Sequence, residues 1–64
     1  MEAFAGCSIV TVVDDKFTLY KDLIMKVWFW HTKFNGIDMV SLNYSGMDEA
    51  ISDQKENKIE WRQL

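Results

Sequence analysis

Cys7 and His31 are the side chains with the most obvious capacity for chemistry, and each is the only residue of its type in the sequence. A thiol beside an imidazole can form a nucleophilic thiolate–imidazolium pair, and both groups bind zinc. No spacing signature links the two residues, and a lone cysteine is more often a small apolar side chain in a core. A zinc site would have to add carboxylates, which makes a poor ligand set. The sequence therefore predicts no catalytic residue and no metal site.

The ten acidic residues are the other candidates for chemistry. Acid–base catalysis needs paired carboxylates in a cleft, whereas these acids lie mainly in a predicted turn and on a predicted helix. Glu49, Asp53 and Glu56 share one helix face by spacing. This acidic strip is either solvated helix surface, which is the commoner case, or a docking edge for a basic partner. The three glycines are too far apart to form a phosphate loop. We expect a protein that is not an enzyme and binds no cofactor.

Composition excludes several other functions. The 64 residues predict a single domain, 1–64. The net charge of −3 disfavours nucleic acids and anionic membranes as partners, because both require a basic patch. Residues 4–7 resemble a lipoprotein cleavage site but lack the preceding basic and apolar regions of a signal peptide. The apolar run 23–30 is too short to span a bilayer. Together with the unpaired cysteine, these features favour a soluble cytoplasmic protein.

The elements that must position any functional surface begin with strands. Residues 8–13 are mostly β-branched and predict a strand, and residues 14–16 form a turn signal. Residues 17–34 fit helical and strand spacing equally well, but 27–32 are poor helix formers and good strand formers. We therefore expect one strand over 17–34, bent or bulged near Lys21 and Asp22.

The strongest local signal is Asn35-Gly36, because both residues adopt the positive φ of a type I′ hairpin turn at little cost. The returning strand is predicted over 37–44, and the two-residue loop fixes its register. The predicted pairs are Phe34 with Ile37, Lys33 with Asp38, Thr32 with Met39, His31 with Val40, Trp30 with Ser41, Phe29 with Leu42 and Trp28 with Asn43. The opposite charges of Lys33 and Asp38 agree with this register.

A helix is predicted to begin at Ser45, which can cap it, and to end near Lys55. Its apolar stripe consists of Met47, Ala50 and Ile51. Residues 58–64 alternate in polarity and predict a final strand. The expected fold class is α+β, a small antiparallel sheet in β-β-β-α-β order with one short helix packed on one face.

The register separates the hairpin into two faces. The face expected to carry the helix and form the core contains Met25, Val27, Phe29, Val40, Leu42 and Tyr44. The other, which we call the tryptophan face, contains Trp28, Trp30, Phe34, Ile37 and Met39. One short helix cannot cover both faces. The N-terminal segment with Phe4 covers the tryptophan face, or a second copy pairs with it, or another protein docks on it.

The sequence thus favours a non-enzymatic protein-binding module that uses the tryptophan face or the acidic strip. Its negative charge would speed encounter with a larger basic target, such as a nucleic-acid-binding protein. In size and charge the chain resembles small acidic proteins of phages and mobile elements, many of which inhibit a host protein or defence complex by occupying its surface. On this reading Trp30→Ala weakens binding by about 2 kcal/mol and leaves the fold intact. The alternative is a structural subunit or homodimer that buries the tryptophan face.

Overall fold

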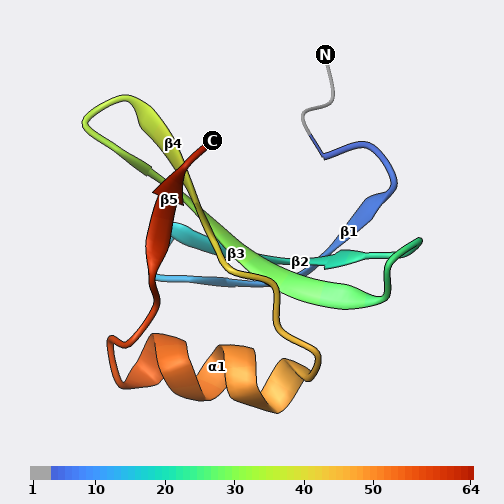
Figure 1. Cartoon of the computed structure of the whole chain (residues 1–64). Helices are drawn as coiled ribbons and strands as arrows, with labels where there is room; N and C mark the ends of the chain where they lie inside the picture. The colour runs from blue at the N-terminus through green and yellow to red at the C-terminus, as the bar shows by residue number, and fades with distance from the viewer. Residues whose placement is uncertain (1–3) are drawn as a thin grey trace.

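The computed structural model describes residues 4–64, which form a five-stranded antiparallel sheet with one helix on a face (Figure 1). The elements are β1 (Cys7–Val13), β2 (Phe17–Asp22), β3 (Val27–Phe34), β4 (Ile37–Ser41), α1 (Met47–Lys55) and β5 (Trp61–Gln63). The strands lie in the order β1-β2-β3-β4-β5, so each pairs with its neighbour in sequence. The predicted α+β class is confirmed, but four strands precede the helix rather than three.

The additional strand arises because residues 17–34 form two strands joined by a tight turn. The carboxylate of Asp22 accepts hydrogen bonds from the backbone N–H groups of Ile24 (2.9 Å) and Met25 (3.0 Å). Lys26 adopts a φ of 59° and donates its backbone N–H to the Asp22 carbonyl at 2.8 Å. The predicted bend is therefore a complete reversal. An aspartate that binds the backbone of the residues after it is a turn signal. The sequence analysis did not predict a turn here because the residues that follow Asp22 are apolar and fit a strand.

The hairpin between β3 and β4 confirms the prediction from Asn35-Gly36. Both residues have positive φ, 51° and 79°, as a type I′ turn requires. The four pairs nearest the turn follow the predicted register: Phe34 with Ile37, Lys33 with Asp38, Thr32 with Met39 and His31 with Val40.

At Trp28 the predicted register is wrong. Trp28 bridges Tyr44 instead of Asn43, so the returning chain holds one extra residue after Ser41. At this interruption of the β3–β4 ladder the Ser41 hydroxyl takes over the backbone hydrogen bonding. It accepts a hydrogen bond from the Trp30 backbone N–H at 2.8 Å and donates one to the Leu42 carbonyl at 2.8 Å. An extra residue reverses the side on which later side chains point. Tyr44 consequently lies on the same side of the sheet as Trp28.

The helix packs on the tryptophan face, which contradicts the predicted core face. The fully buried apolar residues of the described chain are Leu19, Trp30 and Ala50, and Val13, Phe17, Trp28, Tyr44, Ile51, Ile59 and Trp61 pack around them. The Trp30 indole N–H donates to the Ala50 carbonyl at 2.7 Å. Of the residues assigned to the core, only Tyr44 joins this cluster, and Met25 and Leu42 are exposed. Period-two alternation separates two faces but does not say which one the helix covers.

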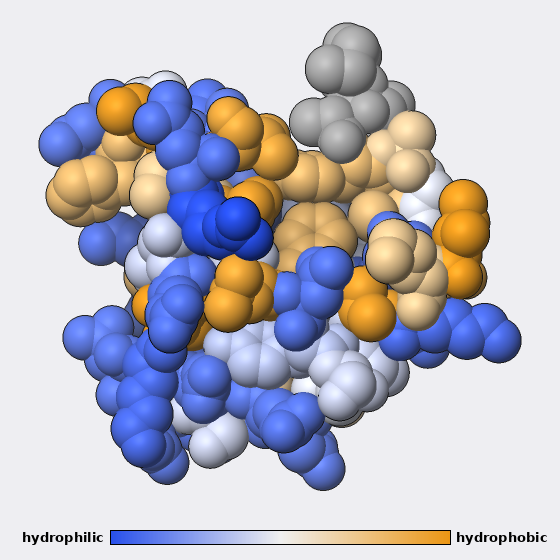
Figure 2. Space-filling model, viewed as in Figure 1, coloured by the Kyte–Doolittle hydropathy of each residue, from blue (hydrophilic) through white to orange (hydrophobic). Residues whose placement is uncertain are grey.

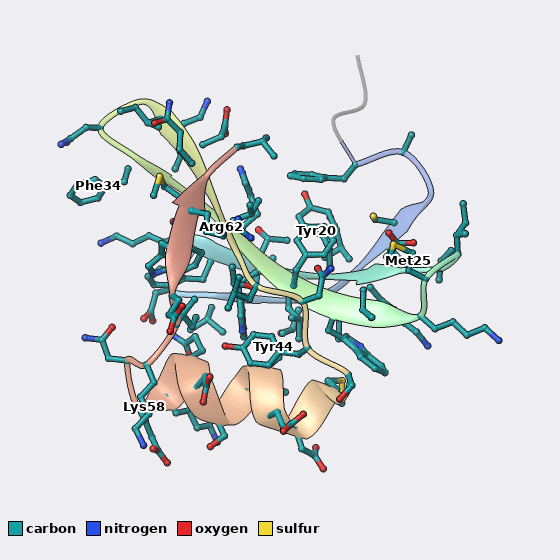
Figure 3. The ribbon with its side chains drawn as sticks, in the orientation of Figure 1. Tyr20, Met25, Phe34, Tyr44, Lys58 and Arg62 are labelled. Atoms are coloured by element: carbon teal, nitrogen blue, oxygen red, sulfur yellow. The ribbon has the colours of Figure 1, made fainter. Side chains whose placement is uncertain are left out.

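The opposite face carries an aromatic cluster in which Phe4 is central. Its ring centroid lies 4.6 Å from that of Tyr20, 5.4 Å from that of Phe29 and 5.1 Å from that of His31. The segment with Phe4 therefore covers the face opposite to the one it was considered for. Figure 3 shows Tyr20 and Tyr44 on the two sides of the sheet.

The ends of the last two elements differ slightly from the prediction. Gly46 is the N-cap of α1 and supplies no side-chain cap, so the predicted capping role of Ser45 is wrong. The Ser45 hydroxyl instead lies 3.4 Å from the Glu49 carboxylate. The final strand spans Trp61–Gln63, which is shorter than the predicted 58–64.

Candidate functional site

The tryptophan face is divided by the helix into a buried part and an exposed part. Trp30 has no exposed surface, so it cannot contact a partner while the chain is folded. Trp28 is half-buried, and the Lys21 ammonium lies 4.8 Å from its ring centroid. The predicted contact residues that remain open lie at the hairpin end, where Phe34 is 68% and Ile37 44% exposed and Met39 is half-buried.

The open part contains a groove of about 390 Å³. Its lining residues are Lys16, Phe17, Thr32, Lys33, Phe34, Met39 and Trp61. The rings of Phe17 and Trp61 stack with centroids 5.9 Å apart. Figure 3 shows Phe34 projecting from the hairpin end on the side that carries α1. In Figure 2 this end shows apolar residues interspersed with hydrophilic ones, whereas the surface over α1 is mainly hydrophilic.

The groove is basic at its rim although the protein as a whole is acidic. Two of the seven lining residues are lysines and none is acidic. Lys33 is exposed, and its ammonium approaches the Asp38 carboxylate only to 4.0 Å. Lys33 and Asp38 face each other in the β3–β4 ladder on the side of the sheet opposite to Phe34, where Asp38 also binds His31, so the Lys33 ammonium is directed away from the floor of the groove. The groove therefore combines an aromatic and thioether floor with one lysine, Lys16, at its rim.

Phe17 and Trp61 were missed as site residues by the sequence analysis. Phe17 lies at the start of β2, and Trp61 is placed beside it because β5 pairs with β4 through Ser41 and Trp61. The alternating pattern around Trp61 gave its strand but not its partner strand. Without that pairing no sequence signal brings the two rings together.

Two of the three residues of the acidic strip on α1 bind other side chains of this protein. Glu49 is exposed, whereas Asp53 accepts the Tyr44 hydroxyl at 2.7 Å. Glu56 forms an ion pair of 2.9 Å with Lys58. Burial, the hydrogen bond to Asp53 and the neighbouring carboxylates raise the pKa of Tyr44 to about 12. Asp53 thus helps to fasten the helix to the sheet.

This bond predicts an alkaline sensitivity. The folded pKa of Tyr44 lies above the ordinary value of 10.0, so the fold favours the neutral phenol. Its stabilising contribution is complete below pH 10 and is lost as the pH rises towards 12. Tyr44→Phe should lower the free energy of unfolding at pH 7 by about 1 kcal/mol and flatten its decrease above pH 10. Urea unfolding at several pH values measures both effects, and an unchanged alkaline slope in the variant would assign that slope to other groups.

Cys7 and His31, the two residues with the most obvious capacity for chemistry, do not line a common site. The His31 imidazole Nε2 lies 3.0 Å from the Asp38 carboxylate. Cys7 lines an open hollow of about 360 Å³ on the same side, and His31 is not among the lining residues. Burial raises the pKa of the Cys7 thiol, and the Asp22 charge raises that pKa further, so thiolate is scarce at neutral pH. Within residues 4–64 no group of three or more metal-ligating side chains gathers.

Comparisons with family models, curated proteins and solved structures gave no significant match to this chain. In the described part of the chain, no helix has the length and apolar character needed to cross a bilayer.

Proposed function

We propose that the protein is a non-enzymatic protein-binding module whose groove receives an apolar side chain of a partner protein next to a carboxylate. The observation that carries this proposal is the exposed apolar surface at the hairpin end, centred on Phe34. Large contiguous apolar patches on soluble proteins often mark interaction sites. The module acts as an inhibitor if the surface it occupies belongs to a partner's working site.

The apolar floor supplies the anchor point. Aromatic residues and Met are enriched in the buried centres of protein interfaces, and anchors that fill pockets contribute most of the binding energy. Phe17, Phe34, Met39 and Trp61 provide such a floor on four strands of one sheet. A partner side chain that enters the groove therefore meets a preformed surface and orders little of this protein.

The charge of the groove indicates which group of the partner lies beside its apolar side chain. Lys16 lines the groove and no lining residue is acidic, so a carboxylate of the partner can pair with Lys16 there. The remaining surface is acidic, since the net charge of the chain is −3. The matching partner has a broadly basic surface, which suits the negative net charge of this protein. The segment of the partner that enters the groove carries a carboxylate, which suits the lysine there.

Selection from a library of random peptides on the immobilised protein tests the proposal. We expect enriched peptides to carry a large apolar residue beside Asp, Glu or a C-terminal carboxylate. Phe34→Ser should weaken their binding by at least tenfold, because it removes an exposed wall of the groove, and the free protein should stay folded. Lys16→Glu should weaken the same peptides and relax the preference for acidic residues.

The matched control is Ile24→Ser, which removes an 84% exposed apolar side chain from the β2–β3 turn outside the groove. It should leave peptide binding unchanged. If no peptide is enriched, or if Phe34→Ser and Ile24→Ser bind alike, the groove is not the binding site.

A further inference from the structure

The two edges of the sheet are protected very differently. β5 is three residues long and carries Arg62, which suits an edge that must not pair with other chains. β1 is seven residues long, Cys7–Val13, and contains no charged residue and no proline. Among the described residues β1 pairs only with β2, so its outer backbone groups face away from the sheet (Figure 1). An uncharged edge strand of this length is a template for pairing with another strand.

A β-bulge strengthens the apolar character of the β1 edge. The register shifts between Ile9 and Thr11, so Ile9 lies opposite Tyr20 and Val12 lies opposite Thr18. The extra residue places Ile9 and Val12 on the same face although they are three positions apart. Ile9 is 62% and Val12 50% exposed. The edge thus presents a short row of β-branched side chains beside the aromatic cluster of Phe4, Tyr20 and Phe29.

We propose that β1 pairs with β1 of a second copy, giving a continuous ten-stranded antiparallel sheet. A two-fold axis near the middle of β1 brings the Cys7 half of one strand against the Val13 half of the other. Ile9 and Val12 of both copies then lie on one face. An uncharged strand brings no like charges together in this arrangement, which is what a self-complementary interface requires.

Self-association would also stabilise a chain whose core is small. Only three apolar residues of the described chain are fully buried. Chains of this size commonly need disulfides, metals or oligomerisation to be stable, and the single cysteine cannot form an internal disulfide. Pairing β1 with β1 removes the open edge and leaves only the charged β5 edges. Association therefore stops at the dimer and does not continue into a fibre.

Sedimentation velocity over a range of concentrations tests this proposal. We expect a reversible monomer–dimer equilibrium with a Kd on the order of tens of micromolar, as for a small interface. Ile9→Lys and Val12→Lys should each raise the Kd by about tenfold or more, because the dimer brings the new charges together. Ile24→Lys, which adds the same charge to the exposed β2–β3 turn, should leave the Kd unchanged.

Hydrogen exchange of the wild-type chain gives a test that needs no variant. Backbone amides of β1 should become more protected as concentration rises, while those of β5 should not. A monomer up to millimolar concentration, a polymer, or protection gained elsewhere would overturn the proposal. Phe34→Ser should dimerise normally, so a failure of the groove and a failure of the β1 interface are distinguishable.

Discussion

Trp30→Ala is expected to leave the chain unfolded at 25 °C. Trp30 is fully buried at the centre of the sheet, and its indole N–H binds the Ala50 carbonyl of the helix. Truncating a buried tryptophan to alanine costs about 3–5 kcal/mol, and a core of this size supplies roughly that much in total. Far-UV circular dichroism and urea unfolding should show no cooperative transition. The sequence led us to expect that this substitution spares the fold and affects only binding, but the structure buries the side chain, so we now expect loss of the fold.

Trp30→Phe separates the two contributions of the indole. It keeps an aromatic ring in the core but removes the donor to Ala50, so it should lower the free energy of unfolding by about 1–3 kcal/mol and leave a folded chain. Trp28→Ala is the matched comparison on the same strand, because Trp28 is only half-buried. A Trp30→Ala protein with a normal urea transition would contradict the packing of α1 on this face.

Leu19→Ala should have the second-largest effect. Leu19 is fully buried and lies directly opposite Trp30 in the β2–β3 ladder. Removing its side chain opens a cavity beneath the helix and should lower the free energy of unfolding by about 2–5 kcal/mol. The decrease in the urea midpoint measures it, with an unchanged m-value if the transition stays two-state.

Two variants bracket this result. Leu19→Met conserves volume and should cost less than about 1.5 kcal/mol. Ile24→Ala removes apolar atoms from a side chain that is 84% exposed and should change stability by no more than about 0.5 kcal/mol. Equal losses for Leu19→Ala and Ile24→Ala would mean that Leu19 is not part of the core.

The candidate site could be predicted in part. Phe34, Ile37 and Met39 were placed on one face by the turn and its register, and the structure leaves Phe34 and Ile37 exposed at the hairpin end. Phe17 and Trp61 could not be placed with them, because their contact depends on strands from the two ends of the chain. The exclusion of Trp30 from the surface also required knowing where the helix lies.

Local chemistry by itself determined the α+β class, the hairpin at Asn35-Gly36 and the four pairs beside it. These features follow from backbone preferences and from the alternation of side chains along a strand, which act over a few residues. The sequence also separated the hairpin into two faces near the turn. Beyond Ser41 an extra residue changes the register, and no backbone preference of the residues there predicts it.

Only the tertiary structure decided which face is the core. Both faces of the hairpin are apolar enough to receive a helix, so the choice depended on the Trp30–Ala50 hydrogen bond, the reversal of Tyr44 and the packing of Phe4 on the opposite side. These are contacts between residues far apart in the sequence, and their free energies add only once the whole sheet is assembled. For the same reason the groove at the hairpin end and the open β1 edge became visible only in the folded protein.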